Sequence, residues 1–373
     1  PTTLRADALA GLTVALVLIP QSMAYAQLAG LPAYIGLYAS FLPVMIGALF
    51  GSSRQLGTGP VAIVSLMSAA AMQPYISQGV ETIVVYSALL AIMIGFFQLS
   101  LGLLKLGVLV DFLSHPVVIG FTNAGALIIG TSQVPKLFGL NVKADQFDHH
   151  YEFLWAILSS LPKTQVITVL MAIIALGMLL TLRKYFPRQP NVLITVVVTT
   201  LLSWALGYQT AGGSVVGAIP QGLPSFNLPS ISMSIQTLGS LATSAMIIGL
   251  LGFVEAISIA KAMAAQTRQR LSANQELVGQ GLANISAGLF SGYAVSGSFS
   301  RSAVNFAAGA VTGFSSVITG ILVAITLLFL TPLLYDLPQA TLAAVIIMAV
   351  INLLKFAPIK HAWKVEKHDG VVA

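Results

Sequence analysis

Two short stretches rich in glycine, serine and proline interrupt a chain whose mean hydropathy is +0.91. Residues 57–61 (Gly-Thr-Gly-Pro-Val) open the apolar segment 59–74, and residues 296–301 (Ser-Gly-Ser-Phe-Ser-Arg) open the segment 299–310. Both segments are shorter than the roughly 20 residues that a helix needs to cross a bilayer. We therefore predict two half-helices, each reached through extended chain at membrane depth.

Anion binding is the chemistry that such half-helices can perform. A helix start leaves backbone N–H groups unpaired and carries about half a positive charge, so two starts that face each other form an anion site. We expect Pro60 in the first helical turn of the first half-helix. The N–H donors are then expected at Val61 and Ala62 and, across the site, at Ser302 and Ala303. The alternative is that these glycine and proline residues only kink helices for packing.

Arg301 adds a full positive charge at the second half-helix. A guanidinium inside a membrane is costly, and intramembrane charges usually face a pathway or a partner. We expect it to attract the anion, with the Ser300 hydroxyl nearby as a further ligand. Two alternatives stay open: the Arg301 side chain extends to the membrane–water interface, or it forms a structural salt bridge with Glu255. Ser300 can equally hold helices together.

Glu255 is the one charged residue of the apolar run 247–260. Loss of water favours the neutral form of a carboxyl group, so Glu255 fits a carrier of protons. Coupling to a proton or cation and a static salt bridge with Arg301 are both open. The first apolar segment is expected to be interrupted at Pro20, where Gln21 could donate to an oxyanion and Tyr25 could line the cavity. A kinked helix with an ordinary buried tyrosine is the alternative.

The composition places these residues in a membrane protein. Of 373 residues, 57% are hydrophobic and 8% are charged, whereas a soluble domain has about a quarter charged residues. Cysteine is absent, and we find no histidine spacing typical of a metal site, no nucleophile motif and no phosphate-binding loop. We expect neither an enzyme nor a cofactor. The net charge of +6 is interpreted as orientation information rather than as a nucleic-acid surface.

Twelve segments are expected to be helical, which predicts an all-α polytopic protein embedded in the lipid bilayer. The half-helices are the third and the tenth, an odd number apart, so the second copy enters the membrane with opposite polarity, as in an inverted repeat. The segments span 8–30, 33–50, 59–74, 82–104, 112–136, 164–182, 191–208, 236–262, 275–293, 299–310, 312–332 and 338–354.

The basic residues predict a cytoplasmic N-terminus. With that orientation thirteen lysines and arginines fall on the cytoplasmic side and three fall outside, and Arg301 stays within the membrane. This asymmetry follows the positive-inside rule, so we predict a multi-pass protein of the inner membrane. The three external residues are Lys136, Lys143 and Lys163.

The domain plan follows from the repeat. Residues 1–235 hold the first inverted repeat with segments one to seven, and residues 236–373 hold segments eight to twelve of the second. A complete plan of seven plus seven would need fourteen segments. The last two helices are therefore expected to lie beyond this chain.

Several stretches resemble the signature of the SulP family, the sulfate-permease-like anion transporters. The first runs from Ile19 through Pro20-Gln21-Ser22-Met23-Ala24-Tyr25 to Pro32, followed by Gly36-Leu37-Tyr38. The resemblance extends from Ala8 to about His361. It also includes residues 51–54, 58–67, 115–122, 253–260 and 298–302.

This resemblance implies two intertwined seven-helix repeats arranged as a core domain and a gate domain, with the half-helices meeting at the midplane. It places the anion between the third and tenth helices, which selects Gln21, Tyr25, Val61, Ala62, Glu255, Ser300, Arg301 and Ser302. It also implies a homodimer and a cytoplasmic STAS domain, which this sequence does not include.

The function that follows is a secondary active carrier of small anions, such as sulfate, bicarbonate, chloride or dicarboxylates, working by alternating access with a coupled proton or cation. Symport and exchange both fit. One alternative is a carrier of related fold for a neutral or weakly acidic planar substrate such as a nucleobase, against which Arg301 argues. Another is an anion channel, because a channel and a carrier share the same site and differ in gating.

Overall fold

The computed structural model describes residues 2–107, 115–142, 146–147, 149–186, 189–229 and 234–353. The chain divides into two compact units, and each unit takes segments from both halves of the sequence. Unit 1 comprises Pro1–Phe112 and Gln221–Phe329, and unit 2 comprises Leu113–Pro220 and Leu330–Ala373. Lys143, Arg188 and residues 354–373, on which part of the predicted orientation rests, lie outside the described residues.

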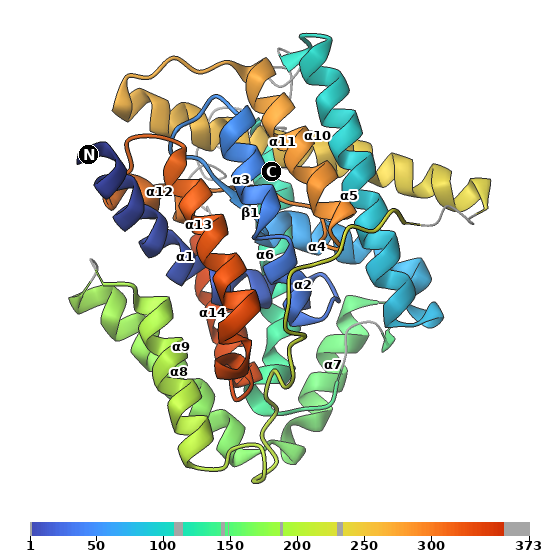
Figure 1. Ribbon diagram of the computed structural model, residues 1–373. Helices are drawn as coiled ribbons and strands as arrows, with labels where there is room; N and C mark the ends of the chain where they lie inside the picture. Colours follow the sequence, from blue (N-terminus) through green and yellow to red (C-terminus); the bar gives the residue numbers. More distant parts are fainter. Residues whose placement is uncertain are drawn as a thin grey trace, which may run out of the picture. The chain divides into compact units, whose positions relative to one another are not determined.

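Unit 1 contains both half-helices and two short strands (Figure 1). Its helices are α1 (Thr2–Leu28), α2 (Ala33–Tyr38), α3 (Leu42–Phe50), α4 (Ala62–Met72), α5 (Val80–Leu103), α10 (Ile235–Thr267), α11 (Ala273–Leu289), α12 (Phe299–Ala307) and α13 (Phe314–Ile325). Its strands are β1 (Gly57–Gly59) and β2 (Ser296–Ser298), and a 3-10 turn (Gln73–Gln78) and a π turn (Thr326–Leu330) extend α4 and α13.

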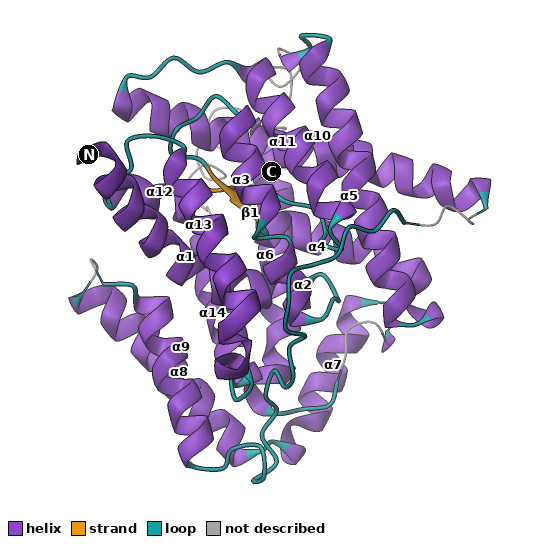
Figure 2. Ribbon diagram, in the orientation of Figure 1, coloured by secondary structure: helices purple, strands orange, loops and turns teal. Residues whose placement is uncertain are grey.

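Unit 2 is helical wherever it has regular structure among the described residues (Figure 2). Its helices are α6 (His115–Phe138), α7 (His150–Ser160), α8 (Val166–Tyr185), α9 (Asn191–Ala205) and α14 (Gln339–Leu353), with 3-10 turns at Leu161–Lys163 and Thr331–Leu334. An isolated bridge between Val215 and Pro338 joins the chain after α9 to the chain before α14.

Six described segments are long and apolar enough to cross a bilayer, which agrees with the predicted polytopic membrane fold. They are Thr3–Leu28, Ala33–Phe50, Val80–Leu103, Val166–Tyr185, Ile235–Thr267 and Phe314–Leu334. The half-helices α4 and α12, with 11 and 9 residues, are too short to span, as predicted.

The structure corrects the sequence prediction at four places. The second predicted segment is two helices, α2 and α3, and α7 was not predicted at all. The first segment is not interrupted: α1 is one helix with Pro20 inside it. A proline removes one backbone hydrogen bond, and neighbouring polar groups can make up the loss in a membrane helix. Pro60 precedes α4 rather than lying in its first turn.

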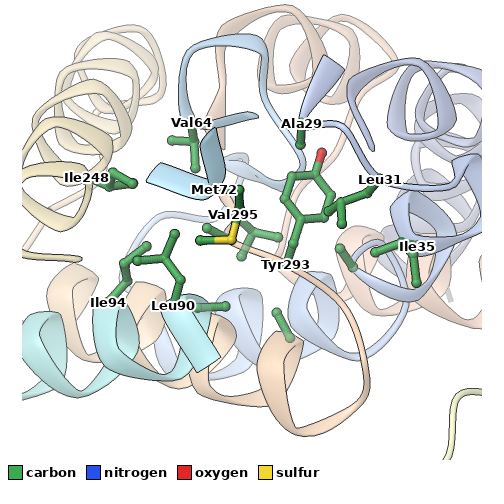
Figure 3. Close-up of a cluster of buried hydrophobic side chains, with 14 of the residues drawn as sticks. Ala29, Leu31, Ile35, Val64, Met72, Leu90, Ile94, Ile248, Tyr293 and Val295 are labelled. Atoms are coloured by element: carbon green, nitrogen blue, oxygen red, sulfur yellow. The ribbon is translucent and has the colours of Figure 1, made fainter. Parts of the chain in front are cut away.

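Close backbone contacts hold unit 1 together. A side chain at Gly95 of α5 would stand 2.5 Å from the carbonyl oxygen of Gly281 in α11, and one at Gly288 would stand 2.2 Å from that of Ala88. Small residues at such crossings let membrane helices approach closely. An apolar cluster that includes Ile35, Leu90 and Tyr293 is buried beside this crossing (Figure 3).

The predicted boundary between the two repeats, at residues 235 and 236, stays a prediction. The compact units are a different division of the chain, because each unit draws on both predicted repeats.

Candidate functional site

The two half-helix starts are joined by the extended chain that precedes them. Strands β1 and β2 pair antiparallel, with Gly57 opposite Ser298 and Gly59 opposite Ser296. All six strand residues are buried. Pairing satisfies backbone groups that would otherwise be exposed in a membrane, which explains how non-helical chain is tolerated here. The sequence prediction of two half-helices entered through extended chain is therefore confirmed.

The start of α4 is bare. Val61 is the N-cap with extended backbone angles (φ −137°, ψ 152°), and no side chain caps the helix. Val61 and Ala62 are buried, with 5% and 6% of their surfaces exposed. The first turn therefore offers backbone N–H groups from Ala62 onward, with no polar side chain of its own beside them.

The start of α12 has polar side chains. Ser298 is the N-cap, and its hydroxyl accepts a hydrogen bond from the backbone N–H of Arg301 at 3.4 Å. The helix begins at Phe299, so Ser302 and Ala303 are its fourth and fifth residues. The unpaired donors of a first turn precede those positions, so the N–H groups expected from them shift to Phe299 and Ser300.

Ser302 instead ties the two starts together through its hydroxyl group. The backbone N–H of Gly57 donates to Ser302 Oγ at 2.9 Å, and that hydroxyl donates to the carbonyl oxygen of Ser298 at 2.6 Å. Ser302 is fully buried. Its position therefore supports a structural link between β1 and α12.

Arg301 is fully buried, with 0% of its surface exposed. Its Nε, Nη1 and Nη2 atoms have no hydrogen-bond partner among the described residues. A side chain at Gly59 would stand 3.2 Å from Nη2, and one at Gly57 would stand 3.0 Å from Arg301 Cβ. The guanidinium therefore lies against β1, the strand that leads into the bare helix start. A buried cation with five N–H donors calls for an acceptor group.

Two tyrosines and a carboxylate interact with this guanidinium. Arg301 interacts electrostatically with Tyr25, Tyr293 and Glu255. The Tyr293 hydroxyl lies 2.9 Å from Ser65 Oγ of α4, which joins the chain before β2 to the first half-helix. Tyr25 and Tyr293 are buried, at 5% and 0% exposed. Sequence reasoning selected Tyr25 and Glu255 but missed Tyr293 and Ser65.

Glu255 reaches this region because α10 packs against β2. Ser296 Oγ donates to the carbonyl oxygen of Gly252 at 2.6 Å. A side chain at Gly297 would stand 3.0 Å from Ala256 Cα, so a glycine is needed for this close approach. Glu255 itself is partly buried. The polar chain of β2 and the acidic residue of α10 are thus held next to each other.

Helix α11 supports both strands through buried polar side chains. Gln280 Nε2 donates to Thr58 Oγ1 of β1 at 2.9 Å. Asn284 exchanges two hydrogen bonds with the backbone of Val295, at 2.9 and 3.0 Å. Glu276 accepts from the N–H groups of Ser52 and Ser53, at 2.9 and 3.0 Å. These residues hold the two strands and the chain around them in place, and no motif in the sequence marked them.

The remaining predicted residues lie in the same unit. Gln21 is 6% exposed, and its Oε1 is buried without a hydrogen-bond partner in the described part of the chain. Ser300 is exposed, and its hydroxyl lies 3.3 Å from that of Ser298. Among the described residues no group of three acidic or histidine side chains could hold a metal ion. Binding by any of these residues stays a prediction.

Comparisons with known proteins agree with this architecture. A family model described as the sulfate permease family matches residues 4–373. The chain is 40% identical to the chloroplastic sulfate transporter 4.1 of Arabidopsis thaliana over 371 residues, covering 98% of this chain and 53% of the relative. It is 35% identical to a probable sulfate transporter of Mycobacterium tuberculosis, covering 99% of this chain and 65% of that protein. The chain thus spans about half to two thirds of the curated relatives it matches.

Solved structures show the same fold. The transmembrane domain of BicA, a cyanobacterial bicarbonate transporter, superposes with a TM-score of 0.88 at 25% identity, covering 99% of this chain and 94% of that chain. The structure of SLC26A9 superposes with a TM-score of 0.90 at 25% identity, covering 99% of this chain and 61% of that chain. The predicted inverted-repeat transporter fold is consistent with both.

Proposed function

The chain belongs to the sulfate permease family, and from that premise we propose that it carries a small anion across a membrane by alternating access. The substrate class is a small inorganic or organic anion (sulfate, bicarbonate, chloride or a dicarboxylate), with sulfate and bicarbonate as the first candidates. Relatives named as sulfate transporters and a structural neighbour named as a bicarbonate transporter support this class.

The buried guanidinium of Arg301 is the observation that carries the proposal. Its three nitrogen atoms have no hydrogen-bond partner among the described residues, and it lies at one helix start and against the strand leading to the other. A cation removed from water is strongly destabilising unless an acceptor compensates it. A bound anion supplies that acceptor, and the two helix starts add partial positive charge around it.

Glu255 supports coupling of anion movement to a proton or cation. It interacts electrostatically with Arg301, so its charge state and the presence of the anion influence each other. A protonated Glu255 leaves the full positive charge of Arg301 available for the anion, whereas an ionised Glu255 offsets part of it. Proton and anion would then bind together and leave together.

The proposed setting is the inner membrane with the N-terminus in the cytoplasm, and the proposed assembly is a homodimer. Because the sequence contains no cysteine, a single cysteine can be introduced at position 268 or 163. Its reaction with a membrane-impermeant reagent can then be compared between the two sides of the membrane. We expect position 268 to react from the cytoplasm and position 163 from outside. Labelling of position 268 from outside would contradict the predicted orientation.

Uptake into proteoliposomes by the full-length protein that carries this chain tests the proposed function. The panel contains sulfate, bicarbonate, chloride, a dicarboxylate and the neutral nucleobase uracil, each with and without a pH gradient. We expect saturable uptake of at least one anion and none of uracil. Uptake of uracil alone would favour a nucleobase carrier. Anion flux that does not saturate and needs no counter-ion or gradient would favour a channel.

A further inference from the structure

Tyr293 is a fully buried tyrosine on the chain between α11 and β2, with 0% of its surface exposed. The backbone is held on both sides of it. The N–H of Gly292 donates to the carbonyl oxygen of Ala287 at 2.7 Å. The N–H of Val295 donates to Asn284 Oδ1 at 2.9 Å. The position of the tyrosine ring is therefore fixed relative to α11 and β2.

The ring of Tyr293 packs in the apolar cluster of unit 1, and its hydroxyl group is the polar end of the side chain. Figure 3 shows the oxygen at the end of the ring that lies away from Leu90 and Ile94. This hydroxyl lies 2.9 Å from Ser65 Oγ of α4, and Ser65 is also fully buried. The two residues thus form a hydroxyl pair that is closed off from solvent.

The hydroxyl pair lies at the proposed anion site. The backbone N–H of Ser65 donates to the carbonyl oxygen of the N-cap Val61 at 3.0 Å, so Ser65 closes the first turn of α4. Helical side chains tilt toward the N-terminus of their helix, which directs the Ser65 hydroxyl toward the first turn. Tyr293 also interacts electrostatically with Arg301 and with Tyr25. The pair is therefore near both the start of α4 and the guanidinium from α12.

One hydrogen atom of the hydroxyl pair has no acceptor in the described part of the chain. Each hydroxyl group has one hydrogen to donate, and the bond between Tyr293 and Ser65 uses one of the two, whichever oxygen is the donor. Neither hydroxyl has a second hydrogen-bond partner among the described residues. Ser40, by contrast, donates to the carbonyl oxygen of Gly36 one turn earlier, at 2.7 Å. A buried O–H donor calls for an acceptor, and an anion beside Arg301 is one.

We propose that Tyr293 is a further ligand of the transported anion and that Ser65 orients it. Ser65 donates to the Tyr293 oxygen, and the hydroxyl hydrogen of Tyr293 is donated to an oxyanion that Arg301 attracts. A phenol is a stronger acid than an alcohol, so it makes the stronger charge-assisted hydrogen bond to an anionic oxygen. The assignment rests on the proposed function, because it requires an anion between the starts of α4 and α12.

Removing the two hydroxyl groups one at a time tests this assignment. Tyr293→Phe and Ser65→Ala break the same hydrogen bond, but only Tyr293→Phe removes the hydrogen that is donated to the anion. Sulfate and bicarbonate binding to the full-length protein is measured by calorimetry. We expect Tyr293→Phe to weaken oxyanion binding by about tenfold and Ser65→Ala to weaken it by less than about threefold. The midpoint of thermal unfolding without anion should fall in both variants.

Tyr208→Phe is the matched control. Tyr208 belongs to unit 2, is 1% exposed, and donates from its hydroxyl group to Thr168 Oγ1 at 3.2 Å. This variant loses the same kind of buried hydrogen bond outside the proposed site. We expect a lower midpoint of thermal unfolding and an unchanged affinity for sulfate and bicarbonate.

Three results would overturn the assignment of Tyr293. Equal losses of affinity in Tyr293→Phe and Ser65→Ala would mean that their shared hydrogen bond has only a structural role. Unchanged affinity in folded Tyr293→Phe protein would mean that the hydroxyl does not contact the anion. With either result, weaker binding by Arg301→Ala would still support the proposed function. A parent protein that binds neither oxyanion would also overturn the assignment, and the proposed function would then depend on uptake of the other anions.

Discussion

The starts of α4 and α12 have the same backbone plan and different chemistry. Each helix begins after a three-residue strand, and the two strands pair with each other. The start of α4 has no capping side chain: Val61 is the N-cap, and Ala62 is the first helical residue. The start of α12 has a serine cap, a buried arginine and a serine that bonds across to Gly57. One start supplies backbone dipoles alone, and the other also supplies the charge.

This difference shows what a repeated backbone does and does not determine. Both starts provide unpaired N–H groups, because any helix start does. The full charge and the hydrogen bond between the two starts depend on side chains, and both come from α12, through Arg301 and Ser302. The glycines of β1 give the room that the arginine needs, since a side chain at Gly59 would stand 3.2 Å from Nη2. The strand before α4 thus leaves room for Arg301 of α12.

Removing the charge should have the largest effect. We expect Arg301→Ala to reduce the rate of anion uptake in proteoliposomes by roughly 100-fold, because it removes hydrogen bonds from a charged donor to the anion. Arg301→Lys should retain part of the activity, since the charge remains but the bidentate geometry is lost. Equal uptake by the parent and by folded Arg301→Ala protein would make Arg301 structural.

Glu255→Gln should change coupling rather than binding. The glutamine cannot exchange a proton, so we expect acceleration of uptake by an inward proton gradient to disappear. Exchange of labelled anion at equal pH on both sides should persist, because Arg301 and both helix starts are intact. Rates are measured with and without the gradient. Unchanged proton dependence in this variant would return Glu255 to a structural role.

A methyl group at Gly59, in the strand that precedes α4, should weaken anion binding. In Gly59→Ala the new methyl carbon would stand 3.2 Å from Nη2 of Arg301, and the alanine would have to adopt a φ of +146°. We expect about tenfold weaker anion binding, because the methyl group displaces the guanidinium. Gly309→Ala is the matched control, because Gly309 has a φ of +89° but open space around it. If both variants weaken binding equally, backbone strain rather than displacement of Arg301 is the cause.

Ser302→Ala should give the smallest effect, and mainly on stability. It leaves the buried N–H of Gly57 without its acceptor at 2.9 Å, a loss of about 1–3 kcal/mol. We expect a lower midpoint of thermal unfolding with anion affinity changed less than in Gly59→Ala. Ser300→Ala serves as the control at an exposed neighbour. A large loss of affinity at unchanged stability would make Ser302 a direct ligand.

The sequence predicted the half-helices because their signal is local. Glycine, serine and proline at residues 57–60 and 296–298 stand out in apolar surroundings, and a charge such as Arg301 is equally conspicuous. Tyr293, Gln280 and Asn284 were missed because neutral polar residues occur in many membrane helices for packing alone. Their roles follow from pairing between segments distant in sequence, such as Gln280 with Thr58.

Helix boundaries were predictable only in part. The prediction placed Pro60 in the first turn of α4, whereas that helix begins at Ala62 after an extended Val61. Pairing of β1 with β2 extends the chain as far as Gly59, and no property of residues 57–61 alone reveals this partner. The prediction also gave a break at Pro20, whereas α1 continues through that residue.

Equilibrium binding of sulfate and of chloride to the purified full-length protein tests whether Arg301 supplies the one full positive charge to an anion held between the starts of α4 and α12. In a site shielded from water, charge on the anion should matter more than its shape. We predict that Arg301→Ala weakens sulfate binding more than chloride binding, and that the defect persists at high ionic strength. A folded Arg301→Ala protein that binds both anions as tightly as the parent would contradict this role of Arg301.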